Sequence, residues 1–469
     1  MGTFHEAFDL SGVRPASYNP RLLDEEAFDA LRASIRELGP IRPIIVTQGG
    51  ILVAGHQRTR AMRAEGLQRA PAFIVPDLPP GDEIRFNQLH NGSDAEFEGG
   101  VVRVPTLPPG WHQVQPRDIR IQPVTSAAGR RNEVLRLLRA YGPWGGVVAG
   151  PDGLVLVGSL YAEACSILRI PIMMRVVGTE LVPAVLRHFS RPYGRYSYAH
   201  LPSQTWYQSY AQMFRLRSKD AGRGKSTLYE QIVIPSLRAG MRVFDFGAGQ
   251  KDYVRVLGAS GVDISGVEFY HRKGGEAQID VQATQDDITT LCRRLEAGPF
   301  DLVLADSVLN SVDSVQAEED VLACLSALCR PGGLMAFSGL SRHAYEARAS
   351  TSTRYLDSCR IVHFFDQDGL SAVYSRGGWF YQKFHTREQV QALAARYVGP
   401  KARIRFESNG WTCHGPREVD QDPDRVIAAI GREFDLPYPD GSRVGRAADV
   451  LQAMIKVGVS ELIVTTGGK

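Results

Sequence analysis

Residues 243–250 read Val-Phe-Asp-Phe-Gly-Ala-Gly-Gln, so a short apolar strand runs directly into a turn with glycines at 247 and 249. A second strand follows and ends in an acid, at Gly266-Val267-Glu268. Glycine lets the backbone approach a ligand closely and tolerates positive φ. In nucleotide-binding βαβ units, an acid at the end of the second strand binds ribose hydroxyls. The stretch therefore predicts an α/β domain with an adenosine-type cofactor.

Two further segments continue this pattern along the chain. Residues 300–306 (Phe-Asp-Leu-Val-Leu-Ala-Asp) are typical of a buried strand, and residues 328–334 (Leu-Cys-Arg-Pro-Gly-Gly-Leu) of a helix end turning into another strand. The ordered combination resembles the class I S-adenosylmethionine-dependent methyltransferases over about residues 239–415. A dehydrogenase is the nearest rival, but the third glycine of its GxGxxG fingerprint would fall at Asp252.

The resemblance implies a Rossmann-like domain with S-adenosylmethionine as cofactor. In that family the Asp-x-Gly-x-Gly turn holds the methionine part and the acid after the second strand binds the ribose. Two acids after an apparent third strand would contact the adenine ring. The implied cofactor residues are Asp245, Gly247, Gly249, Glu268, Asp286 and Asp287.

The expected acceptor loop is residues 306–312, Asp-Ser-Val-Leu-Asn-Ser-Val. It lacks the (D/N/S)PP(Y/F/W) motif of amino-methylating DNA enzymes and the Pro-Cys nucleophile of cytosine-C5 enzymes. Asp306 and Asn310 are the candidate catalytic residues, because ligands of open α/β sheets bind at the carboxyl ends of strands. A helix N-cap is an equally good explanation for Asp306.

Bulk composition excludes several classes of protein. The chain has 469 residues, 43% of them hydrophobic, which is long enough for about three domains. Its net charge is only +3, so we expect no overall electrostatic attraction to nucleic acid or membrane. Six cysteines show no CxxC spacing, which argues against a zinc site or a disulfide framework, and we predict no metal. No apolar run approaches the ~20 residues that cross a bilayer, and we expect a cytoplasmic protein.

The amino-terminal part carries an independent signature. Residues 43–46 and 51–54 are typical of two strands of a hairpin, and Gly55-His56-Gln57-Arg58 opens a helix. This order resembles the amino-terminal domain of the ParB and sulfiredoxin superfamily, an α+β fold. There the Gly-x-x-Arg turn holds nucleotide phosphates at a helix amino terminus. The resemblance makes Gly55, His56, Gln57 and Arg58 candidate nucleotide or phosphate contacts, with a purely structural turn as the alternative.

Departures from that superfamily limit what it implies. Partition-type ParB proteins carry Gly-Glu-Arg-Arg at this turn and sulfiredoxins a reactive Gly-Cys-His-Arg, whereas position 56 here is His. Neither CTP hydrolysis nor thiol chemistry therefore carries over. The Gly-His-x-Arg form resembles ParB-like modules that are fused to methyltransferases.

A second copy of this order follows within residues 111–178. Gly158 corresponds to Gly55 and Ala164 to Ala61 at the same offset, but Ser159, Leu160 and Tyr161 replace the polar residues of the turn. We expect a degenerate module with a structural or dimer-forming role. Two chance α/β units of similar order are the alternative.

Residues 188–230 interleave basic and aromatic side chains, which suits nucleic acid because cations neutralise phosphates and rings stack on bases. A helical cover over the sheet is the alternative. A P-loop at 224–227 is excluded, because Lys219 stands where its first glycine is required. The expected nucleic-acid contacts are Arg215, Arg217, Lys219, Arg223 and Lys225.

These predictions combine into one expected domain organisation: a ParB-like domain (1–100), a degenerate second module (101–187), a basic-aromatic helical bridge (188–238), the methyltransferase domain (239–415) and a helical extension (416–469). The predicted function is methyl transfer in DNA or other nucleic-acid modification, with DNA as partner and a homodimer compatible with the modules. A DNA- or nucleotide-binding protein with a non-catalytic methyltransferase fold, and a small-molecule or protein methyltransferase, are the alternatives.

Overall fold

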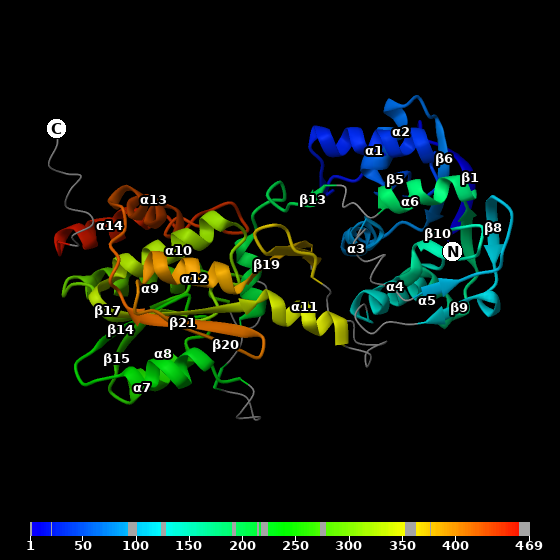
Figure 1. Cartoon of the computed structure of the whole chain (residues 1–469). Coiled ribbons are helices and arrows are strands. Elements are labelled where there is room, and N and C mark those ends of the chain that lie inside the picture. The colour runs from blue at the N-terminus through cyan, green and yellow to red at the C-terminus, as the bar shows by residue number, and fades with distance from the viewer. Residues whose placement is uncertain are drawn as a thin grey trace. The chain divides into compact units, whose positions relative to one another are not determined.

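The computed structural model describes residues 2–19, 21–91, 101–122, 128–189, 194–212, 215–216, 224–272, 278–351, 363–375 and 377–458. Its contacts divide the chain into two compact units (Figure 1). The front unit comprises Met1–Leu201 with Tyr345–Gln367, and the second unit comprises Pro202–Ala344 with Asp368–Lys469. This division differs from the expected boundaries, because a segment from the second half of the chain belongs to the front unit and the expected bridge is split at residue 201.

The first half of the front unit is a five-stranded sheet in the order β1-β6-β4-β5-β2, covered by helices. Asp24 caps the first long helix by accepting a hydrogen bond from Ala27 N–H. The elements are β1 (Thr3–Asp9), β2 (Arg14–Pro15), β3 (Arg21–Leu22), α1 (Glu25–Leu38), β4 (Ile44–Thr47), β5 (Ile51–Ala54), α2 (His56–Ala64), β6 (Arg69–Val75) and α3 (Pro80–Asn91).

The second half of the front unit has a four-stranded sheet in the order β11-β10-β12-β8. Its neighbours are antiparallel, parallel and antiparallel in turn, as are those of β5-β4-β6-β1. The elements are β7 (Val101–Arg103), β8 (Gly110–Val114), η2 (Pro116–Asp118), β9 (Arg120–Gln122), α4 (Ala128–Tyr141), β10 (Gly146–Ala149), β11 (Val155–Val157), α5 (Ser159–Leu168), β12 (Ile172–Val176), η3 (Thr179–Leu181), α6 (Val182–Phe189) and β13 (Arg195–Tyr196).

The second unit is built on a sheet in the order β15-β14-β16-β17-β19-β18, parallel from β15 to β17. The elements are η4 (Thr205–Ala211), η5 (Tyr229–Val233), α7 (Ile234–Ser236), β14 (Arg242–Phe246), α8 (Asp252–Ala259), β15 (Asp263–Val267), α9 (Val281–Leu295), β16 (Phe300–Ala305), α10 (Val315–Leu328), β17 (Cys329–Ser341), β18 (Leu370–Ser375), β19 (Gly378–His385), α12 (Arg387–Tyr397), β20 (Arg403–Glu407), β21 (Gly410–Pro416), α13 (Pro423–Glu433) and α14 (Ala447–Lys456). Helix α11 (Arg342–Thr351) begins in the second unit, and its residues from Tyr345 on belong to the front unit.

The far edge of this sheet turns antiparallel. Strand β21 pairs antiparallel with β17 and carries β20 beyond it. At the other edge, the third strand expected before Asp286 and Asp287 is absent from the described residues, where only an isolated bridge joins Arg272 and Ile279. Both acids lie on α9 instead.

Apolar side chains cover both faces of the second sheet. Helices α9, α10 and α12 lie on one face, and α7 and α8 on the other (Figure 1). The expected carboxy-terminal extension contributes to the hydrophobic core on the face covered by α9, α10 and α12. Phe434 packs edge-on there against Phe246 and Phe269, at ring distances of 6.1 and 5.5 Å. Helices α13 and α14 are therefore part of the packed domain.

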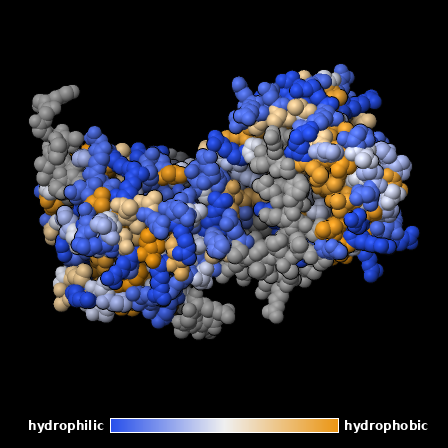
Figure 2. Space-filling view, viewed as in Figure 1, coloured by the Kyte–Doolittle hydropathy of each residue, from blue (hydrophilic) through white to orange (hydrophobic). Residues whose placement is uncertain are grey.

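Large apolar side chains exposed on the described surface are scattered, and hydrophilic residues dominate the drawn face of each unit (Figure 2). None of the helices in the described ranges is long and apolar enough to cross a membrane.

Candidate functional site

Three acids meet at one edge of the second sheet. Asp245 lies near the end of β14, Glu268 directly follows β15, and Asp306 directly follows β16. These strands are parallel neighbours, so their carboxyl ends share an edge. The tertiary structure thus brings together residues that the sequence predicts to bind cofactor and acceptor.

The glycine turn after β14 has the geometry that glycine permits. Gly247 and Gly249 have φ of 74° and 54°, and the N–H groups of Gly247 and Ala248 both donate to Val267 O at 2.9 Å. A Cβ on Gly247 would lie 2.6 Å from Val308 Cγ2, whereas a Cβ on Gly249 would meet no atom within 4 Å. Gly247 therefore allows the acceptor loop to pack closely, and Gly249 borders open space.

Asp245 is buried with only half of its carboxylate engaged. Its Oδ2 accepts a hydrogen bond from Tyr229 Oη at 2.6 Å, and its Oδ1 has no hydrogen-bond partner. Burial raises the pKa of Asp245 to about 7; the bond from Tyr229 opposes the rise, and the Asp306 and Glu268 charges add to it. A buried carboxylate oxygen without a donor is suited to a cationic ligand.

Glu268 ties the second strand end to the glycine turn. Its Oε2 accepts from Gly249 N–H at 2.7 Å and its Oε1 from Tyr270 N–H at 2.9 Å. The orphaned Asp245 oxygen, the open space at Gly249 and this fixed carboxylate fit a cofactor that carries an ammonium group and a ribose.

The two acids on α9 differ in their surroundings. Asp287 accepts from Glu268 N–H at 3.1 Å, lies 2.7 Å from His271 Nε2 and pairs with Lys251 Nζ. Asp286 accepts from Gln282 and is exposed. Asp287 therefore supports Glu268 and the glycine turn, and adenine contact by either acid stays a prediction.

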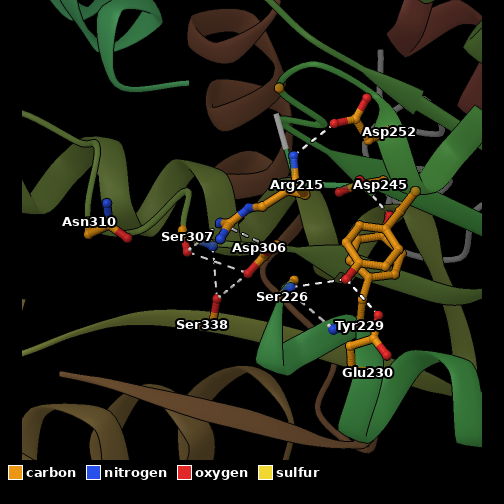
Figure 3. Close-up of polar contacts among 12 residues, drawn as sticks. Arg215, Ser226, Tyr229, Glu230, Asp245, Asp252, Asp306, Ser307, Asn310 and Ser338 are labelled. Carbon is orange, nitrogen blue, oxygen red and sulfur yellow. Dashed lines mark hydrogen bonds and ion pairs between the residues drawn. The ribbon is translucent and has the colours of Figure 1, made fainter. Parts of the chain in front are cut away.

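The acceptor loop is held by side chains from several elements (Figure 3). Asp306 Oδ1 accepts from Ser338 Oγ at 3.0 Å, and its Oδ2 lies 3.3 Å from Arg215 Nη2. Asn310 follows in the same loop, where its backbone oxygen accepts from Lys383 N–H at 3.2 Å and its buried Oδ1 has no partner. Asp306 is held as an ion pair, and Asn310 offers an unused acceptor.

The predicted nucleic-acid residues are only partly described. Arg215 lies within the site, where its backbone N–H also donates to Asp252 at 2.7 Å, and Lys225 lies 3.5 Å from Glu230. Arg217, Lys219 and Arg223 lie outside the described residues. Arg215 thus has a local partner in Asp306, which its place in the basic run did not predict.

A separate pocket lies at the Gly55 turn of the front unit. Gly55 has φ 97° and precedes α2, and the pocket is lined by this turn and by apolar residues of α1. Its charged lining residues are all basic or His: Arg21, Arg42, Arg58, His90 and His188, with His56 also present. This basic lining suits a small anionic ligand.

The predicted residues of that turn are engaged in different ways. Arg58 donates to Arg42 O at 2.9 Å and lies 3.0 Å from His90 Nδ1. Gln57 Oε1 is buried without a partner. His56 Nε2 accepts from Ala16 N–H at 3.2 Å, and burial lowers the pKa of His56 to about 4, so its ring is neutral at pH 7. His56 anchors the turn from inside.

Comparison with known proteins agrees with both halves of this arrangement. A ParB N-terminal domain family matches residues 4–85, and a methyltransferase domain family matches residues 218–379. The chain joins a ParB N-terminal domain to a methyltransferase domain. Both predicted resemblances and the mixed α/β fold class are confirmed. S-adenosylmethionine is the cofactor of the methyltransferase domain.

Curated relatives match a short part of the chain. The "Probable chromosome-partitioning protein ParB" of Campylobacter jejuni is 41% identical over 85 residues, 17% of this chain and 29% of the relative. "Chromosome-partitioning protein Spo0J" of Thermus thermophilus is 37% identical over 86 residues, 18% and 32% of the two chains. The chain thus spans less than a third of these curated relatives.

Solved structures include a SAM-dependent methyltransferase from Methanosarcina mazei, 14% identical, covering 40% of this chain and 98% of that one with a TM-score of 0.28.

Tyr229 is a site residue that the sequence does not assign. It belongs to the aromatic run before the methyltransferase sheet, stacks on Tyr253 at 4.1 Å and donates to Asp245. No local sequence motif indicates this role, because its partner Asp245 lies on β14, a separate element 16 residues further along the chain.

Proposed function

We propose that the chain transfers the methyl group of S-adenosylmethionine to a nucleic-acid acceptor, with DNA as the first choice. The observation that carries methyl transfer is the unpartnered, buried oxygen of Asp245, which precedes a glycine turn with open space at Gly249. Asp245 would bind the ammonium of the cofactor and Glu268 its ribose. The bound cofactor supplies an electrophilic methyl group.

The acceptor would lie over Asp306 and Asn310. Both residues border the carboxyl end of β16, next to the glycine turn, and Asn310 Oδ1 is free to accept a hydrogen bond from an acceptor N–H or O–H. Ser338 and Arg215 hold the Asp306 carboxylate in place. Catalysis would then rest on proximity and in-line alignment of acceptor and methyl group.

The ParB N-terminal domain supports the choice of nucleic acid. Its pocket has an all-basic charged lining and the amino terminus of α2, which are features that bind phosphate groups. We propose that it binds a nucleoside phosphate through Gly55–Arg58, chiefly through Arg58 and the N–H groups of the turn.

The test is incubation of the full chain with radiolabelled S-adenosylmethionine and, separately, duplex DNA, single-stranded DNA, RNA and cell extract. Label in DNA or RNA, lost in Asp245→Ala, is the expected result. Label only in protein or small molecules would contradict the nucleic-acid acceptor and retain methyl transfer. Cofactor binding without any label would leave the fold as a non-catalytic scaffold.

A further inference from the structure

The two halves of the front unit contact each other reciprocally. The helix that ends the first half, α3, packs on its own β5 and on α4 of the second half. The helix that ends the second half, α6, packs on its own β11 and on α1 of the first half. Such reciprocity is the mark of a two-fold interface between like modules, here within one chain.

Individual residues repeat this exchange when the halves are matched at an offset of 103 residues, which relates Gly55 to Gly158. Phe86 of the first half packs against Tyr141 and Trp144 of the second, at ring distances of 5.7 and 5.1 Å. Its counterpart Phe189 packs into the cluster that contains the counterparts of those residues, Leu38 and Ile41. The same three positions thus cluster twice, with the halves interchanged.

Each turn is therefore bordered by the closing helix of the other half. The pocket at Gly55 is lined by His188 and Phe189 of α6, and a second pocket at Gly158 is lined by residues 88–90 of α3.

The two turns differ in the residue that stands at the position of Arg58. Tyr161 occupies the position of Arg58, and its hydroxyl accepts from Trp144 N–H at 3.1 Å while the two rings pack edge-on at 4.9 Å. A Cβ on Gly145 would lie 3.2 Å from the Tyr161 ring, so this aromatic side chain packs closely against the loop that precedes β10. The first pocket keeps the Arg58 guanidinium at this position, and the charged lining of both pockets is basic.

Helix α6 is fixed at the rim of that first pocket by ion pairs. Arg187 Nη2 lies 2.5 and 2.7 Å from the two carboxylate oxygens of Glu37 on α1, and His188 Nε2 lies 2.7 Å from Glu37 Oε2. Hydrogen bonds from Arg187 and His188 hold the pKa of Glu37 below its usual value. Phe189, one residue further on, is positioned as a wall of the pocket.

We propose that the second half of the front unit is the closing wall of the ligand site at Gly55–Arg58, with Phe189 as the residue that packs against the organic part of a bound nucleoside phosphate. The inference rests on the phosphate site proposed above. Arg58 and the turn would bind the phosphates, and Phe189 together with the apolar face of α1 would bind the nucleoside, because rings gain from stacking on an aromatic side chain.

Calorimetry with the four ribonucleoside triphosphates and with inorganic tripolyphosphate tests this on the full chain. Phe189→Ala is expected to weaken nucleotide binding at least tenfold and to leave tripolyphosphate binding within twofold. Leu186→Ala on the same helix is the control, since Leu186 is 42% exposed and does not line the pocket. Arg58→Ala should weaken both ligands.

The outcomes separate the two ideas. If Arg58→Ala abolishes binding and Phe189→Ala binds nucleotide as the wild type does, the closing wall is wrong and the phosphate site stands. If the wild type binds neither ligand, or Arg58→Ala binds both unchanged, the phosphate site and the wall fail together. Glu37→Gln, a surface change that loosens α6, should weaken nucleotide binding in the same direction as Phe189→Ala.

Discussion

At the scale of single residues, Asp245 is the most informative position in the methyltransferase domain. Its burial follows from its place in the central strand, and its unpartnered oxygen marks where a cation would bind. Sequence alone predicts Asp245 as a cofactor contact but not its raised pKa, because that shift depends first on burial in the folded domain and then on the charges of Asp306 and Glu268 from neighbouring strands.

Cofactor affinity should therefore depend on pH. With a pKa of about 7, Asp245 loses its charge as pH falls through neutrality, so affinity for S-adenosylhomocysteine should fall about tenfold per unit below pH 7. The unliganded domain should show the opposite trend, because a carboxyl group with a raised pKa stabilises the fold below about pH 4 and loses that contribution as pH rises through 7. Calorimetry at pH 6 and 8 tests the first trend, and Asp245→Asn should abolish it.

Gly249 offers a second residue-scale test with a matched control. Gly249→Ala and Gly240→Ala both place a side chain at positive φ in open space, so each should cost about 1 kcal/mol of unfolding free energy. Only Gly249 borders the proposed cofactor site, and only its variant should bind S-adenosylhomocysteine at least tenfold more weakly. Equal cofactor binding by both variants would remove Gly249 from the site.

At the scale of elements, the structure differs most from the sequence-based expectation at the carboxy-terminal helices. Their positions around residues 437–441 follow from the sequence, since α13 and α14 flank that turn. Their packing does not, because an amphipathic helix shows which face is apolar and not which sheet covers it.

Phe434, which directly follows α13, tests the contribution of these helices to the domain core. Phe434→Ala should lower the free energy of unfolding of the second unit by about 3–5 kcal/mol, since the ring is fully buried. Ile455→Ala on α14, 45% exposed, should change it by less than about 0.5 kcal/mol. Hydrogen exchange in peptides from β14 during urea unfolding gives the measurement, and equal effects of the two variants would contradict the packing.

At the scale of the whole molecule, the chain returns to the front unit after entering the methyltransferase sheet. Phe364 is buried in the front unit, where its backbone oxygen accepts from Tyr198 Oη at 2.6 Å and the Arg85 guanidinium lies 6.0 Å from its ring. No motif in the surrounding residues indicates this position.

Phe364→Ala should consequently destabilise the front unit and spare the second. Hydrogen exchange should rise in peptides of α3, which carries Arg85, and stay unchanged in peptides of β14 and β16. Phe434→Ala should give the reverse pattern, which provides the control. Faster exchange in both units of the Phe364 variant would show that the two units unfold together.

The sequence by itself determined the glycine turn after β14, the acid that follows the second strand, the ParB-like turn and the repeat of its order, because each depends on residues that are close along the chain and on glycine where the backbone needs it. The tertiary structure decided the place of Asp286 and Asp287 on α9, the Arg215–Asp306 pair, the Tyr229 bond to Asp245 and the exchange of α3 and α6 between the halves. These depend on which distant elements pack together, and local pattern does not specify that choice.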